Sequence, residues 1–129
     1  GGTFEEKLRR KIEAHFEILK KNPKIPFLVI NEITTNPERI ASLRDSIGEL
    51  PLSVYATFEQ DLQKEIAQGR VRETNALDLM FSALSLNLAT FLVRPVLQNI
   101  LGLTDEAMDG FLEHRKEENV KIILQSLKP

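Results

Sequence analysis

The chain has 129 residues, with 17 Lys and Arg against 19 Asp and Glu, and a formal charge of -2 at pH 7. This length suits one hydrophobic core, so we expect residues 1–129 to form a single domain. The content of 42% hydrophobic and 28% charged residues excludes a disordered or fibrous chain. The absence of cysteine excludes disulfides and thiolate metal sites and fits a reducing, cytoplasmic location. The near-neutral charge predicts that this chain alone does not bind duplex DNA.

Hydrophobic residues recur at helical spacing throughout, and no alternating strand pattern occurs, so we predict an all-α bundle of about six to seven helices. Thr3 and Glu6 form a capping-box pattern that begins the first helix. Asn22-Pro23 ends that helix. Its apolar stripe consists of Phe4, Leu8, Ile12, Phe16 and Leu19.

Three prolines mark the starts of the next helices. Pro26 begins a helix over Phe27 to Thr35, whose apolar run leaves hardly any polar face and predicts a buried helix. Asn36-Pro37 begins a short helix that ends near Gly48. Pro51 begins a longer helix that ends at Gly69. The apolar side of that longer helix consists of Leu52, Tyr55, Phe58, Leu62 and Ile66.

The segment from Asn75 to Arg94 is apolar on all sides of the predicted helix. A domain of this size has difficulty covering such a helix alone, so we expect a partner chain or a cavity-forming shell to share the task. Its uncharged stretch, Leu79 to Val93, is shorter than the roughly 20 residues that a bilayer requires, so we expect no membrane span.

The remaining segments predict one short and one long helix. Arg94-Pro95 breaks the apolar helix, and a short helix follows to Gly102. Thr104 caps the last helix, which runs to about Leu127. The residues that stand at helical spacing along this last helix are Met108, Phe111, Arg115, Asn119, Ile122 and Ile123.

No motif for catalysis or metal binding occurs. His15 and His114 are the only histidines, and neither stands at a metal-ligand spacing with two carboxylates. No nucleophile elbow and no glycine-rich phosphate loop is present. We therefore expect no enzyme activity, no metal and no cofactor.

Several residues allow both a structural and a ligand-binding interpretation. His15 lies on the apolar stripe of the first helix, where it either contacts a ligand or satisfies a core hydrogen bond. Polar side chains in apolar helices raise the same question at Asn31, Glu32, Tyr55 and Asn87. Apolar residues that fit either a soft pocket or plain core are Phe27, Phe58, Met80 and Phe81. For the basic cluster Lys7 to Lys11 we favour a solvated helical face, and a phosphate contact is the alternative interpretation.

The order of segments resembles the regulatory domain of TetR-family transcriptional repressors. The segments that carry the likeness are Gly69-Arg-Val-Arg, Asn75-Ala-Leu-Asp-Leu-Met, Phe91-Leu-Val-Arg-Pro, Leu101-Gly-Leu-Thr and Phe111-Leu-Glu-His-Arg-Lys-Glu-Glu, with Pro26-Phe-Leu-Val-Ile-Asn-Glu-Ile and Asn36-Pro37-Glu38 upstream. The likeness covers essentially the whole chain. It implies that a helix-turn-helix DNA-binding domain precedes this domain in such proteins, and we expect that domain to lie outside this chain.

The resemblance also implies an arrangement of subunits. The last two long helices of such domains pair with those of a second subunit in a four-helix bundle, and the other helices enclose an inducer pocket. For a homodimer seam we select Leu88, Leu92, Phe111, Arg115, Ile122 and Ile123. For the pocket of a small apolar or amphipathic effector we select His15, Leu19, Phe27, Asn31, Tyr55, Phe58, Met80, Phe81 and Leu84.

The leading hypothesis is therefore an effector-sensing and homodimerisation domain, which contacts DNA only through a separate DNA-binding domain. A helical protein–protein adaptor without a small ligand has the same composition, and the lack of a cavity of a few hundred Å3 would favour it. A helical enzyme would need convergent titratable groups, such as His15 beside two carboxylates.

Overall fold

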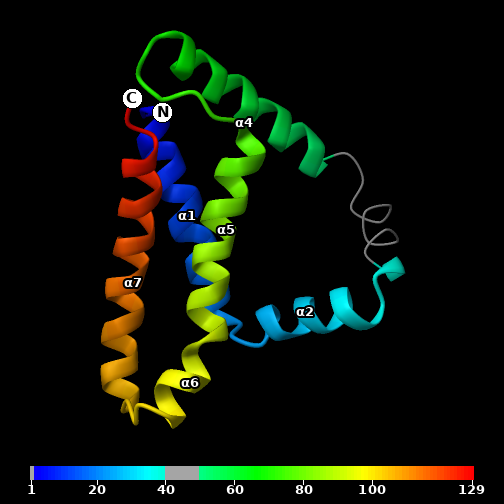
Figure 1. Ribbon diagram of the computed structural model, residues 1–129, viewed down its shortest axis with the longest axis vertical. Helices are drawn as coiled ribbons and strands as arrows, with labels where there is room; N and C mark the ends of the chain where they lie inside the picture. Colours follow the sequence, from blue (N-terminus) through cyan, green and yellow to red (C-terminus); the bar gives the residue numbers. More distant parts are fainter. Residues whose placement is uncertain (1, 40–49) are drawn as a thin grey trace.

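The computed structural model describes residues 2–39 and 50–129 (Figure 1). Its helices are α1 (Phe4–Lys21), α2 (Ile25–Thr35), α4 (Leu50–Ala67), α5 (Ala76–Leu92), α6 (Arg94–Asn99) and α7 (Asp105–Ser126). No strand occurs in these two ranges, which confirms the predicted all-α class. The number of helices and the dimer bundle stay predictions. The short helix predicted up to Gly48 falls mostly on residues 40–49, outside the described residues.

The predicted helix ends are confirmed by their caps. The Thr3 hydroxyl accepts a hydrogen bond from the Glu6 amide at 3.1 Å, and the Glu6 carboxylate accepts one from the Thr3 amide at 3.4 Å, which completes the capping box. The Thr104 hydroxyl, the predicted cap of α7, accepts a hydrogen bond from the Ala107 amide at 3.1 Å. At the start of α5, Asn75 Oδ1 accepts one from the Asp78 amide at 2.9 Å. Gly69 follows α4 with a φ of +74°, a left-handed conformation that glycine adopts without a steric penalty.

Helices α1, α5 and α7 form the central bundle, in which α7 runs opposite to the other two (Figure 1). One part of the core joins this bundle to α4 and consists of Phe4, Leu8, Ile12, Phe58, Leu62, Val71, Ala76, Leu79, Val120, Ile123 and Leu127. The other part lies near α6 and consists of Phe16, Leu19, Phe91, Met108 and Leu112. All five residues of the predicted α1 stripe are buried, so that stripe is confirmed.

Helix α2 contacts the bundle at α5 but projects sideways from it, and the prediction that it is buried is wrong (Figure 1). Leu28 is 61% exposed and Ile33 is 50% exposed, and Pro26 is the one residue of α2 that is buried. The physical reason is geometric. An apolar helix is buried only where other elements lie on all its sides, and α2 projects sideways from the bundle.

Helix α5 is buried on one side and open on the other. Asn87, Thr90 and Phe91 face the bundle, whereas Leu77 is 64% exposed and Phe81 is 72% exposed. Because α6 follows almost directly, the helical stretch Ala76–Asn99 is longer than the uncharged segment alone indicated. By length and composition it is sufficient to cross a membrane, which is weak evidence from a single helix. Since α5 contacts each of the other described helices, it is the central helix of the fold.

Candidate functional site

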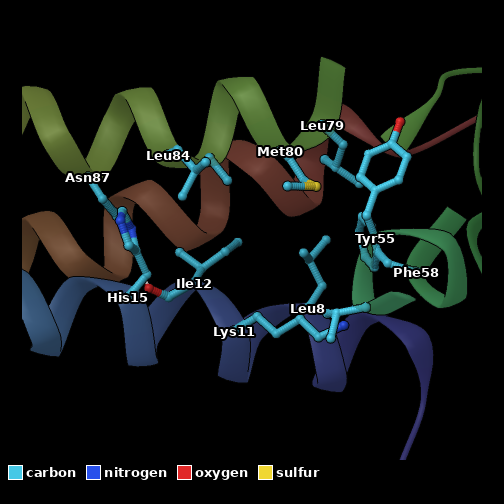
Figure 2. Close-up of a pocket in the computed structure, with 12 residues that line it drawn as sticks. Leu8, Lys11, Ile12, His15, Tyr55, Phe58, Leu79, Met80, Leu84 and Asn87 are labelled. Atoms are coloured by element: carbon cyan, nitrogen blue, oxygen red, sulfur yellow. The ribbon is translucent and has the colours of Figure 1, made fainter. Parts of the chain in front are cut away.

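A cavity of about 470 Å3 lies between α1, α4 and α5 (Figure 2). We call it the α1–α4–α5 cavity. Its walls are formed by Leu8, Lys11, Ile12, His15, Val54, Tyr55, Phe58, Leu79, Met80, Ala83, Leu84 and Asn87. Val54 and Leu84 are largely exposed, so solvent reaches the cavity along these two side chains. The volume is in the range of sites that bind small molecules.

Helical spacing brings these residues to common faces. On α1, Leu8, Lys11 and His15 are three or four positions apart and therefore lie on one side of the helix. Helix α4 lies across the end of the bundle, where Leu62 packs in the core, and two further contacts help to hold it there. The Phe4 and Phe58 rings stack with centroids 5.7 Å apart. The Glu59 carboxylate accepts a hydrogen bond of 2.7 Å from the backbone amide of Ala76, at the start of α5. Beside these contacts, the α1–α4–α5 cavity separates part of α4 from the side of α1.

The structure brings part of the predicted pocket together. His15, Tyr55, Phe58, Met80 and Leu84 all line the α1–α4–α5 cavity. Figure 2 shows His15 at one end of it and Tyr55 with Phe58 at the other. Whether they bind a ligand stays a prediction.

The other predicted pocket residues lie elsewhere. Leu19 is buried in the core near α6, where it packs with Phe16 and Phe91. Phe27 and Asn31 are exposed on α2, and Phe81 is exposed on α5. None of these four side chains lines the α1–α4–α5 cavity.

Sequence reasoning did not select several wall residues as pocket residues. Leu8, Ile12 and Leu79 had the pattern of plain core, and Lys11 had the pattern of a solvated face. The spacing of Leu8, Lys11 and His15 was a usable signal, because it places a cation on the same side of α1 as the histidine.

A buried polar network joins the cavity wall to α7. The Asn87 side-chain nitrogen Nδ2 lies 3.1 Å from the Ile12 carbonyl oxygen and 3.0 Å from His15 Nδ1. Asn119 Nδ2 donates to Asn87 Oδ1 at 3.0 Å and to the Thr90 hydroxyl at 3.3 Å. Arg115 Nε donates to Asn119 Oδ1 at 2.7 Å. Asn87 and Asn119 are fully buried, so the network satisfies polar groups that have no access to water.

The donors of this network determine the protonation of His15. Arg115 Nε can only donate, so the Asn119 atom it contacts is the carbonyl oxygen, and the Asn119 nitrogen then donates to the Asn87 oxygen. Asn87 Nδ2 therefore donates both of its hydrogens, one to the Ile12 carbonyl and one to His15 Nδ1. His15 is left neutral, with its proton on Nε2.

Burial acts on His15 in the same direction. Desolvation of the partly buried ring lowers the pKa of His15 below its ordinary value. A proton on Nδ1 would also face the donor Nδ2 of Asn87. Both effects favour the neutral ring, whose Nε2–H has no hydrogen-bond acceptor among the described residues.

The residues selected for a dimer seam lie in different environments. Ile123 is only 2% exposed and packs in the subunit's own core, so its side chain is not available to a partner. Leu88, Leu92 and Phe111 are half-buried, and Ile122 is exposed. Arg115 is half-buried and takes part in the polar network.

Comparison with known families identifies the domain. A family model described as "Tetracyclin repressor-like, C-terminal domain" matches residues 5–123. The chain belongs to this family. The resemblance to TetR-like regulators inferred from the segment order is thereby confirmed. No curated protein and no solved structure is significantly similar to the chain. Domains of this family belong to regulators of transcription rather than to enzymes.

Proposed function

We propose that this TetR-like C-terminal domain senses a small, largely apolar effector and forms a homodimer. The observation that carries the proposal is the α1–α4–α5 cavity, which is of ligand size and mostly apolar. Four of its polar or aromatic wall residues, His15, Tyr55, Phe58 and Asn87, come from three different helices. A ligand that contacts all three helices therefore has a means to change their relative positions.

The mechanism is a shift between two arrangements of the helices. A ligand that binds one arrangement better than the other moves the equilibrium toward it. Helix α1 forms one wall of the cavity, so its position relative to α5 differs between the two arrangements. A coupling of about 1–3 kcal/mol would change operator affinity roughly 5- to 150-fold. In this proposal DNA is bound by a helix-turn-helix domain outside residues 1–129, and the protein acts in the cytoplasm.

The homodimer uses α5 and α7. Its support is the apolar surface that the single chain leaves uncovered on these helices, at Leu77, Phe81 and Ile122. Light scattering at micromolar concentration tests this part, and we expect twice the 14.7 kDa mass of the chain. A monomer of 14.7 kDa would contradict it.

Ligand binding is tested by thermal unfolding in the presence of a panel of small apolar compounds. We expect at least one class to raise the unfolding temperature, because a ligand that binds only the folded state stabilises it. The substitution Ala83→Phe places a ring at the cavity wall and should abolish the stabilisation. Ala89→Phe is the matched control, since Ala89 is exposed on the same helix and does not line the cavity. Stabilisation that survives Ala83→Phe would place the ligand elsewhere.

A protein–protein adaptor is the second candidate, and the exposed apolar side chains of α2 favour it. The two candidates differ in the panel experiment. An adaptor predicts no stabilisation by any small compound, and a partner whose binding is lost on replacing Leu28 or Ile33 with a charged residue.

A further inference from the structure

The polar atoms that the α1–α4–α5 cavity offers to a ligand are donors. Both hydrogens of Asn87 Nδ2 and its oxygen are already used within the protein. The Tyr55 hydroxyl points away from α1 in Figure 2. The Lys11 ammonium and the His15 Nε2–H remain. No Asp or Glu is among the described residues that line the cavity.

Lys11 and His15 lie one helical turn apart on the same side of α1. Lys11 Nζ is 4.7 Å from the centre of the Phe58 ring, so the ammonium group lies at the boundary between α1 and α4. At an exposed site a cation–π contact of this kind stabilises by only about 0.5–1 kcal/mol. It therefore orients the ammonium without preventing it from pairing with an anion.

We propose that the cavity binds a small carboxylate with an apolar body, whose carboxylate accepts a hydrogen bond from the Lys11 ammonium at the Phe58 end while the apolar body extends toward His15 at the other end. The inference rests on the proposed function and specifies its ligand class. The apolar body packs against Ile12, Leu79 and Met80, which form the interior walls. A cationic ligand would meet the Lys11 charge and find no acceptor. A neutral alcohol would gain the apolar contacts and could accept a hydrogen bond from Lys11, but it would lack the attraction between opposite charges that strengthens the bond to a carboxylate.

A matched ten-carbon series tests the ligand class. Decanoate, 1-decanol and decylamine share an apolar body and differ in head-group charge at about pH 7.5. Calorimetric titration should show decanoate binding about 10-fold more tightly than decanol, and decylamine binding most weakly. Added salt should reduce the ratio of decanoate to decanol affinity.

Equal binding of decanoate and decanol would overturn the charge recognition but leave an apolar sensor intact. The same holds if decylamine binds most tightly. If none of the three binds, the carboxylate inference fails, whereas the proposed function fails only if the wider panel also gives no ligand.

The substitution Lys11→Met removes the charge and keeps an apolar stem. We expect it to weaken decanoate about 10-fold and to leave decanol within about 2-fold. Lys121→Met is the control, because Lys121 is exposed on α7 and does not line the cavity. An equal loss for decanoate and decanol would show that Lys11 acts through packing, and no loss for either would show that it does not contact the ligand. Either result would overturn the inference.

Discussion

Helix α5 of the bundle and helix α2 are equally apolar in sequence but differ in their surroundings. In the bundle, Phe16 and Phe91 are almost fully buried, with ring centroids 5.0 Å apart. On α2, Phe27 and Leu28 are exposed. The comparison shows that apolar composition determines which helices need cover, whereas the neighbouring elements determine which helices receive it.

The largest expected effect is the loss of a buried ring from the bundle. Phe16→Ala should lower the free energy of unfolding by about 3–5 kcal/mol, because it removes apolar contacts and leaves a cavity. Phe27→Ala removes the same ring from α2 and should cost less than about 1 kcal/mol. Denaturant unfolding of both variants measures the difference. If Phe27→Ala costs as much as Phe16→Ala, α2 is covered in solution and does not differ from the bundle in burial.

This contrast also separates what the sequence could predict from what it could not. The caps at Thr3 and Thr104 depend on residues a few positions apart, so local pattern was sufficient to predict them. The exposure of α2 depends on where distant helices lie, and no local pattern contains that information. The predicted homodimer is one arrangement that would cover exposed apolar surface.

The lining of the cavity was also predictable from the sequence only in part. The sequence indicated which sides of the helices are apolar, and this was enough to select His15, Phe58 and Met80 among the wall residues. It did not indicate whether a facing helix fills the space. Leu19 lies on the same stripe as Leu8, but it faces Phe91 and Met108, which leave no space beside it.

The second prediction concerns the buried polar network of the bundle. Asn119→Ala should cost about 2–4 kcal/mol, because it removes the partner of Asn87 Oδ1 and of Arg115 Nε and leaves the Thr90 hydroxyl with only its bond to the Leu86 carbonyl. Asn99→Ala, at an exposed position on α6, should change the unfolding free energy by less than about 0.5 kcal/mol. Equal effects of the two substitutions would mean that water or neighbouring groups replace the amide of Asn119.

The third prediction is a pH dependence that originates at His15. Because the pKa of His15 is lowered in the folded state, the unfolded chain binds the proton more readily. This contribution to stability is complete above about pH 6.5, the ordinary value for histidine, and is lost as the pH falls below it. His15→Gln should reduce the slope of unfolding free energy against pH in that window. His114→Gln, on the exposed side of α7, should keep the slope. An unchanged slope in His15→Gln would assign the dependence to other groups.

The smallest effect is expected at the ion pairs that join α1 and α7 at the surface. Glu113 lies 2.9 Å from Lys20 and 3.3 Å from Lys116, and hydrogen bonds from these two amines lower the pKa of its carboxyl. The Glu113 side chain is 55% exposed, so water and salt screen the attraction. Glu113→Gln should therefore cost less than about 1 kcal/mol in denaturant unfolding, and the cost should shrink as salt is added. We expect the buried contacts of Phe16 and Asn119 to supply most of the attachment between α1 and α7. If Glu113→Gln costs as much as Asn119→Ala and the cost does not change with salt, charge at this surface holds the two helices together instead.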